Sequence, residues 1–225
     1  MNNIKDHLSI VGQAVIELVP YIGGSINTLI SEYQAKRKHE RLLDFYSSLR
    51  NDFEKFKENL NSEFTSTDDF LDVFEETANK IVNERSSDKR IAFKNILINS
   101  CLASVIDYDY TEENLRLLAR LRSEHLFFLK LFYNPKSFNL ERANLLGEGG
   151  GISTTLSTLL RVIIPEYIDE KILDICNDLE NERLLSNVVN SYNANMTDKG
   201  ITHLENKLSA KGKRFYNFII EPSAL

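Results

Sequence analysis

Apolar residues recur every three or four positions along most of the chain, which is the spacing of one face of an α-helix. The first such stripe runs through Ile4, Leu8, Val11, Val15 and Leu18. Similar stripes follow up to about residue 106, separated by polar breaks such as NERSSDKR (83–90). The pattern predicts a mainly α protein in which residues 1–108 form an N-terminal helical bundle.

The stretch ELVPYIGGSINTLISEY (17–33) places a proline and two glycines between two of these stripes. Pro20 lacks a backbone N–H and should end the first helix. The Gly23–Gly24 pair would allow left-handed backbone angles, and Ser25 would cap the next helix. A membrane hairpin would not favour Glu17, and a phosphate-binding loop would need a lysine that this stretch lacks. We therefore expect a bend between two packed helices.

A long amphipathic helix is expected after this bend, extending to about residue 60. Its apolar positions form a nearly heptad stripe, the pattern of helices that pack along one another. The stripe consists of Leu42, Phe45, Leu49, Phe53, Phe56 and Leu60. A bundle of this size would leave part of so long a stripe uncovered. These residues are therefore candidates for self-association, and they predict a homodimer.

The second half of the chain has shorter helical patterns separated by turns. These patterns span residues 111–133, 153–164 and 167–183. The segment 186–209 alternates weakly, as a small β-hairpin would, and SAKGKRFYNFI (209–219) returns to helical spacing. Helices followed by a hairpin and a last helix are the order of a winged-helix module. Residues 111–225 are therefore predicted to be a winged-helix-like domain, separable from residues 1–108.

Three phrases of this half resemble the end of winged-helix modules in uncharacterised bacterial helical proteins. They are DLENERLL (178–185), MTDKG (196–200) and LSAKGKRFYNFI (208–219). In those modules a helix ends in D-L-x-x-x-x-L-L, a wing follows, and L-S/T-x-x-G-x-x-F-x-x-F-I forms the last helix. VPYIGG (19–24) before a long amphipathic helix resembles the same group. The resemblance implies a fold, and it carries no agreed activity.

Composition favours a cytoplasmic protein. The 225 residues carry a net charge of -6, so no overall positive field attracts nucleic acid. Cys101 and Cys176 lie in apolar helical patterns and are expected to be buried free thiols, as in a reducing compartment. The start MNNIKDHLSIVG does not resemble a signal peptide, and no stretch of about 18 residues is free of polar groups.

No local motif indicates catalysis, so a non-enzymatic protein without a cofactor or metal is predicted. The glycine-rich GEGGGIST (147–154) lacks the lysine of a phosphate-binding loop, and its Glu148 would repel phosphate. It is expected to be a flexible connector. The histidines have no metal-ligand spacing, and no nucleophile elbow, kinase motif set or catalytic-cysteine signature is present. The histidines are His7, His39, His125 and His203.

Basic residues gather in two places. The run KRKHER (36–41) would form a solvated helix stripe paired with nearby carboxylates, or would contact nucleic acid or anionic lipid. The expected recognition helix, 167–183, carries six acidic and two basic residues and would be repelled by DNA. The wing side is the candidate nucleic-acid contact, formed by Lys207, Lys211, Lys213 and Arg214.

These observations favour a non-enzymatic interaction or regulatory protein that acts through helix packing and a winged-helix-like module. Its partner would be another protein or a second copy of the chain. One alternative is a DNA-binding regulator that uses the basic wing side, with weak binding expected. Another is a membrane-acting effector that releases its N-terminal apolar helices, although the charged positions among them disfavour membrane contact.

Overall fold

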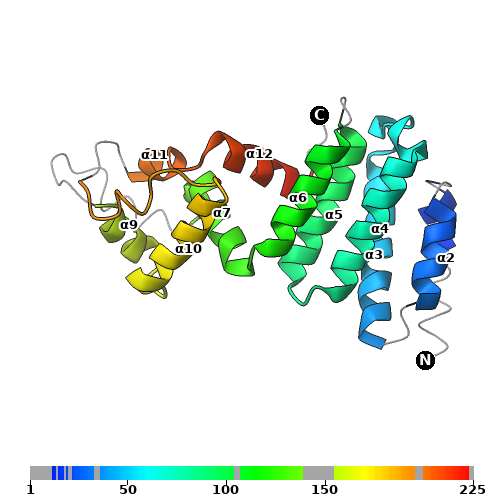
Figure 1. The fold of residues 1–225 in the computed structure, drawn as a ribbon, viewed down its shortest axis with the longest axis horizontal. Coiled ribbons are helices and arrows are strands. Elements are labelled where there is room, and N and C mark those ends of the chain that lie inside the picture. Colours follow the sequence, from blue (N-terminus) through cyan, green and yellow to red (C-terminus); the bar gives the residue numbers. More distant parts are fainter. Residues whose placement is uncertain are drawn as a thin grey trace. The chain divides into compact units, whose positions relative to one another are not determined.

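The computed structural model of the chain is mainly helical, as the apolar pattern predicts (Figure 1). It describes residues 12–13, 15–17, 19, 22–32, 36–103, 107–138, 155–195 and 200–222. The helices are α2 (Gly23–Glu32), α3 (Lys36–Lys55), α4 (Asp68–Asn83), α5 (Ser87–Leu102), α6 (Tyr108–Arg120), α7 (Ser123–Tyr133), α9 (Leu156–Ile163), α10 (Asp169–Asn181), α11 (Gly200–Glu205) and α12 (Ala210–Ile219). Short 3-10 turns span Lys57–Asn59 (η2), Phe64–Ser66 (η3) and Pro135–Ser137 (η4). Within the described ranges, β-pairing is limited to two isolated antiparallel bridges.

The described residues form two compact units. The first contains the residues up to Arg120 together with those from Phe218 onward, and the second contains Leu121 to Asn217. In the first unit, α4 packs against α3, α5 and α6, and α5 also packs against α3 and α6 (Figure 1). The division therefore differs from the predicted domains 1–108 and 111–225. The reason is that the buried face of α6 packs within the first unit.

The apolar stripe of α3 lies in the core of the first unit. Its residues, each at most 4% exposed, are Leu42, Phe45, Leu49, Phe53 and Phe56. Leu60, beyond the end of the helix, is half-buried. The rings of Phe45 and Phe74 of α4 lie 6.1 Å apart between centroids. A homodimer cannot use this stripe in this fold, because α4 and α5 of the same chain already cover it.

The segment before α2 packs against α2, as expected for a bend between two helices. Val15, Val19 and Ile26 are buried. A Cβ atom on Gly12 would lie only 2.9 Å from the Ile26 side chain, so the two segments are in close contact. Pro20, the expected end of the first helix, lies outside the described residues.

The start of α2, after that proline, differs from the predicted glycine turn and serine cap. The Gly23–Gly24 pair begins α2 itself, and neither glycine has a left-handed φ. Ser25 lies inside the helix, where its hydroxyl donates to Glu75 Oε1 of α4. Glycine permits left-handed angles without requiring them, and here the helix simply starts two residues earlier.

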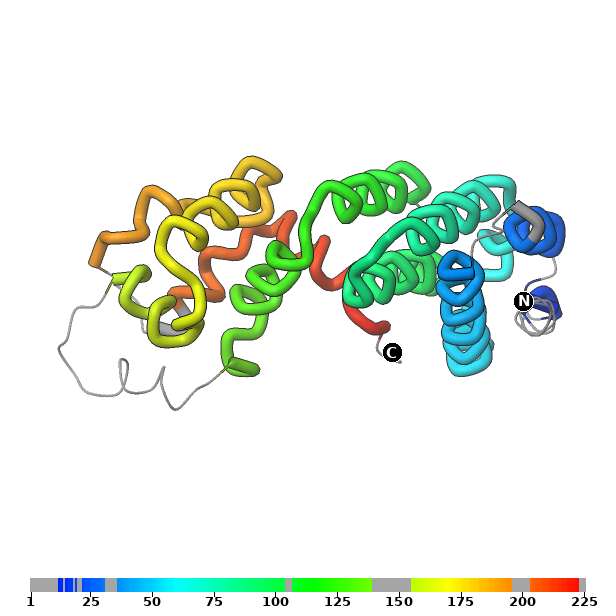
Figure 2. The backbone as a smooth tube through the Cα atoms, turned by 90° about the horizontal axis from the view of Figure 1, so that it is seen from below, coloured from blue at the N-terminus to red at the C-terminus, as the bar shows by residue number. Residues whose placement is uncertain are grey.

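Two side-chain amides of α5 hold the end of α12. Asn95 Nδ2 donates to the Ile219 carbonyl at 2.9 Å. Asn99 Nδ2 donates to the carbonyls of Phe218 and Ile220 at 2.9 and 3.2 Å. Carbonyls at a helix C-terminus lack intrahelical donors, so these amides cap α12. Figure 2 traces the backbone of these segments without side chains. This contact, here called the asparagine clasp, explains why the residues from Phe218 onward belong to the first unit.

The second unit has a short helix where a wing strand was predicted. Leu185 and Leu208 form an isolated antiparallel bridge. In place of a strand leading to that bridge, Gly200–Glu205 form α11. Leu204 and Leu208 are both buried and lie four positions apart, which favours a helical turn over an extended strand. The predicted connector GEGGGIST (147–154) lies outside the described residues.

The DLENERLL phrase ends α10 in a left-handed turn. Arg183 has a φ of 60°. Its N–H donates to the Glu180 carbonyl and the Leu184 N–H donates to the Leu179 carbonyl, both at 2.8 Å. This pair of bonds is the Schellman arrangement of a helix C-terminus. Because Leu179 and Leu184 are both fully buried, the chain leaves the helix in one fixed direction.

The LSAKGKRFYNFI phrase begins α12 against that turn. Ser209 Oγ accepts the Gly212 N–H at 2.8 Å, and the hydroxyl donates to the Arg183 carbonyl at 2.7 Å. A Cβ atom on Gly212 would overlap the Leu184 carbonyl oxygen. Glycine is therefore needed for the close approach of two backbone segments.

We expect Gly212→Ala to destabilise the protein by roughly 1–3 kcal/mol, the usual cost of overpacking, because a backbone carbonyl cannot move aside. Gly24→Ala is the matched control, since a Cβ there would meet nothing within 4 Å. Alanine should stabilise that helix by up to about 1 kcal/mol. Urea unfolding followed by circular dichroism measures both changes. Equal effects of the two substitutions would contradict the close-approach explanation.

Candidate functional site

A groove between α3 and α5 of the first unit combines positive charge with exposed apolar surface. It encloses a hollow of about 240 Å³. Each of the two helices contributes positions i, i+3, i+4 and i+7, which share one helix face. The lining residues, here called the α3–α5 groove, are Arg41, Asp44, Phe45 and Ser48 of α3, Ile81 of α4, and Ser87, Arg90, Ile91 and Lys94.

Ile91 is the exposed apolar residue of this groove, with 54% of its surface accessible. Its neighbours Ala92 and Phe93 are both buried. Phe45 and Ile81 are buried as well and give the hollow an apolar lining. An accessible apolar side chain beside a packed apolar wall gives an apolar side chain of a partner a surface on which it can leave water.

The two arginines of the groove are held by backbone carbonyls. Arg41 Nη1 donates to the Val82 carbonyl at 2.7 Å. Arg90 Nη1 donates to the carbonyls of Glu84 and Arg85 at 3.2 and 2.8 Å. These carbonyls lie at or just beyond the end of α4, where intrahelical donors are missing. In the described part of the chain neither arginine pairs with a carboxylate, so both charges remain available to a binding partner.

Lys94 closes one end of the groove through an ion pair with Asp52 of α3. The two side chains are only 12% and 13% exposed, so the pair belongs to the packing between α3 and α5. The charges that remain at the surface of the groove are those of Arg41, Arg90 and the exposed Asp44. The groove therefore keeps a net positive charge.

The size of the hollow limits what it can hold. Small-molecule sites in proteins enclose roughly 300–1,000 Å³, and this hollow is smaller. It would hold one or two side chains of a partner more readily than a complete cofactor. Its charge and its apolar lining fit a segment in which an apolar side chain stands next to carboxylates.

A larger, acidic cleft of about 640 Å³ lies along α4 of the same unit. Its lining residues are Asp72, Glu75, Glu76, Asn79, Lys80, Asn83, Glu84, Phe93 and Ala119. Glu76 pairs with Lys80 at 3.6 Å, and Glu84 pairs with Lys89 at 2.9 Å. Because Phe93 is only 1% exposed, the cleft offers no accessible aromatic anchor. It is a solvated acidic surface.

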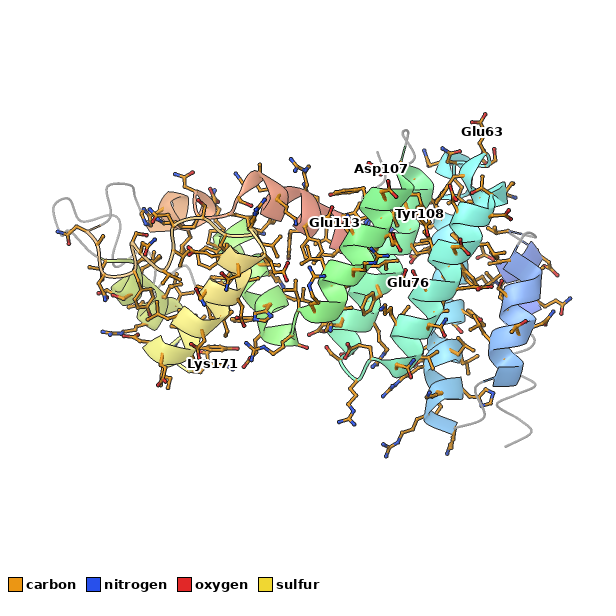
Figure 3. All side chains as sticks on the ribbon, in the orientation of Figure 1. Glu63, Glu76, Asp107, Tyr108, Glu113 and Lys171 are labelled. Atoms are coloured by element: carbon orange, nitrogen blue, oxygen red, sulfur yellow. The ribbon has the colours of Figure 1, made fainter. Side chains whose placement is uncertain are left out.

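The field of these carboxylates acts on Tyr108, at the start of α6. Burial raises the pKa of the Tyr108 hydroxyl, and the charges of Glu112, Asp72 and Glu76 raise it further. Figure 3 labels Tyr108 on α6 and Glu76 on the adjacent α4. The acidic cleft and the α3–α5 groove thus present opposite charges on one unit.

His125, a buried histidine of the second unit, is occupied by structural contacts. The Arg122 N–H donates to Nδ1 at 2.9 Å, and Nε2 lies 3.2 Å from Asp178 Oδ2. Burial lowers the pKa of His125, and the nearby Arg122 charge lowers it further. Neither ring nitrogen is left to accept a proton from a substrate. The residue caps α7 and ties it to α10.

The two cysteines are buried free thiols, as predicted. Burial raises the pKa of Cys101 and of Cys176 to about 12, so both stay protonated near neutral pH and are weak nucleophiles. Among the residues that the structure describes, no three His, Cys, Asp or Glu side chains gather as metal ligands would.

The predicted nucleic-acid contacts do not form one accessible basic surface. Lys207 is only 8% exposed. Its Nζ donates to the Asn187 carbonyl at 2.9 Å and to Ser191 Oγ at 2.7 Å. The Asn187 carbonyl, in a left-handed turn with φ 54°, also accepts the Ser191 hydroxyl, so Lys207 joins a local hydrogen-bond network. The other three residues, Lys211, Lys213 and Arg214, lie on α12.

The run KRKHER is only partly the solvated stripe that the sequence predicts. Lys36 pairs with Glu40 at 3.8 Å, as expected for positions four apart. His39, in contrast, is 2% exposed, and its Nε2 lies 3.3 Å from the Ile30 carbonyl. Arg41 lines the groove.

Sequence reasoning missed the other half of the groove, which is formed by Arg90 and Ile91. These residues belong to no motif. IAFKNILINSCLASVI (91–106) is apolar on most sides, which is the pattern of a buried central helix, so the sequence gives no signal that Ile91 faces solvent.

Comparison of the sequence with protein-family models gives no match, and comparisons with curated proteins and with solved structures give none either. Within the described ranges, none of the helices has both the length and the apolar character needed to cross a bilayer.

We expect the free energy of unfolding to fall as the pH is lowered through 6.5, the ordinary pKa of histidine. The folded-state pKa of His125 lies below that value, so the unfolded chain binds the proton more tightly. His125→Gln should flatten this slope between about pH 5.5 and 7.5, because glutamine at the same position can still cap α7. Carboxylates titrate below this window. Urea titrations at several pH values measure the slope, and equal slopes for both proteins would refute the assignment.

Proposed function

We propose that this chain is a non-enzymatic interaction protein. Its first unit uses the α3–α5 groove to hold an acidic, partly apolar segment of a partner protein. The observation that carries the proposal is Ile91, 54% exposed, in one groove with two arginines that pair with no carboxylate of the described chain.

The chemistry of the groove supports a protein partner. Protein interfaces gain most of their affinity from a few packed apolar and arginine side chains surrounded by a polar rim. The guanidinium groups of Arg41 and Arg90 are already positioned by backbone carbonyls. Less side-chain entropy is therefore lost when they bind a carboxylate. A segment with one apolar residue flanked by Asp or Glu would fill the apolar hollow and pair with the two arginines.

The remaining titratable groups support a non-enzymatic role. His125 is committed to the α7 cap and to Asp178. Cys101 and Cys176 are protonated at neutral pH. For the second unit we keep the winged-helix-like arrangement as a proposal. It is supported by the antiparallel bridge of Leu185 and Leu208, which lie in sequence between the end of α10 and the start of α12.

The proposal is tested with a fluorescein-labelled helical peptide of roughly 18 residues, about five turns. It carries leucine on one face and glutamate elsewhere, and a second peptide carries lysine in place of glutamate. We expect the glutamate peptide to bind and the lysine peptide not to bind. Ile91→Glu should weaken binding at least about tenfold, near 1.4 kcal/mol, because it removes the apolar anchor and adds a repelling charge. Fluorescence anisotropy measures the affinities, and Ile91 methyl NMR signals locate the contact.

Two controls accompany this measurement. Lys213→Glu with Arg214→Glu changes exposed charge on α12 and should leave peptide binding unchanged. A labelled DNA duplex tests the nucleic-acid alternative. Duplex binding that survives Ile91→Glu but fails in the α12 variant would overturn the proposal in favour of DNA recognition. Equal binding of the two peptides would also overturn it.

A further inference from the structure

Two large apolar residues remain exposed in the part of the chain that the structure describes. Ile91 lies in the α3–α5 groove of the first unit, and Ile168, 69% exposed, lies in the second unit immediately before α10. Isolated exposed isoleucines are ordinary. Here, however, the charges around the two residues are opposite, and this is the observation that needs an explanation.

Carboxylates flank Ile168 along the chain. Glu166 and Glu170 are exposed, and neither makes an ion pair within the described residues. Asp169 is already bound by Arg161. We call Glu166, Ile168 and Glu170 the Ile168 corner. It carries an apolar side chain between two unpaired negative charges. This composition complements the two arginines and the apolar lining of the α3–α5 groove.

The Ile168 corner is held rigidly by its own unit. The Tyr167 ring stacks on Phe127 at 5.7 Å between centroids and meets Phe128 edge-on at 5.3 Å. Lys171, one turn into α10, pairs with Glu124 of α7 at 2.8 Å. A segment fixed in this way loses little conformational entropy on binding.

We infer that the α3–α5 groove of one copy of this chain binds the Ile168 corner of a second copy. The apolar side chains of Ile91 and Ile168 would share the hollow, and Arg41 and Arg90 would face Glu166 and Glu170. This inference rests on the proposed function and names the partner of that same groove. The patches on the two copies are different, so the contact is heterologous. It does not involve the α3 stripe, which the core covers.

A contact of this size should be weak. A groove that buries a few side chains falls at the small end of protein interfaces, and we expect a dissociation constant on the order of 10–100 µM. Its ionic rim is exposed to solvent, so raising the NaCl concentration from about 0.05 to 0.5 M should weaken the association.

The test uses two variants of the full chain and sedimentation velocity. Ile91→Glu blocks the groove and leaves the corner intact. Ile168→Lys blocks the corner and leaves the groove intact. We expect the wild-type protein to associate with increasing concentration, and each variant alone to associate at least about tenfold more weakly. An equimolar mixture of the two variants should form a 1:1 complex, because the corner of one still fits the groove of the other.

Both substitutions replace exposed residues, and thermal melts of each variant check that the fold is retained. Lys213→Glu is the charge control and should associate like the wild type. The inference is overturned if the wild type stays monomeric to about ten times the expected dissociation constant, if either variant alone associates normally, or if the mixture does not form a complex. Should the wild type stay monomeric while the groove still binds the leucine–glutamate peptide, the proposed function stands and only the identity of the partner is wrong.

Discussion

Burial of the apolar stripe of α3 against α4 and α5 is the interaction on which the first unit depends. Each fully buried leucine or phenylalanine contributes roughly 1.5–3 kcal/mol. Because α4 reverses the chain between them, α3 and α5 run in the same direction (Figure 1). One face of each helix is buried in the core. The adjoining faces of α3 and α5 lie next to each other, and the Lys94–Asp52 ion pair joins them. The α3–α5 groove is thus a consequence of how the core is closed.

The apolar spacing predicted that the chain is mainly helical, because a helix face is a local property of the chain. It did not predict every helix boundary: the long helix expected after the bend is two helices, α2 and α3, and the pattern over 111–133 is divided between α6 and α7. It could not predict what covers each face. The stripe through Leu42 and Leu49 looked like a dimer seam only because periodicity does not reveal that α4 and α5 fold back over it. The same limit applies to the groove, since Arg41 and Ile91 are fifty residues apart in sequence and become neighbours only after packing. The burial of Lys207 could not be predicted for a related reason: its charge is visible in the sequence, but the Asn187 carbonyl and the Ser191 hydroxyl that accept its hydrogen bonds are not.

Three cations of this acidic chain make the same kind of hydrogen bond but differ in how much of their charge stays exposed. Arg41, Arg90 and Lys207 all donate to backbone carbonyls that secondary structure leaves without a partner. Lys207 has three donors and is buried, so its charge is not accessible to a binding partner. An arginine has five donors in a fixed fork, and one nitrogen can hold the backbone while the others face outward. The net charge of -6 describes an average and gives no hint of this local arrangement.

The asparagine clasp has a consequence for the order in which the chain can fold during synthesis. Asn95 and Asn99 leave the ribosome well before the carbonyls of Phe218, Ile219 and Ile220 that they bind. The whole second unit is made in between. At roughly 5–20 residues per second, α5 would wait about 6–25 s for its partner. The unit that begins first is therefore completed last, and a pause or truncation late in translation would leave its amides without the carbonyls that they bind.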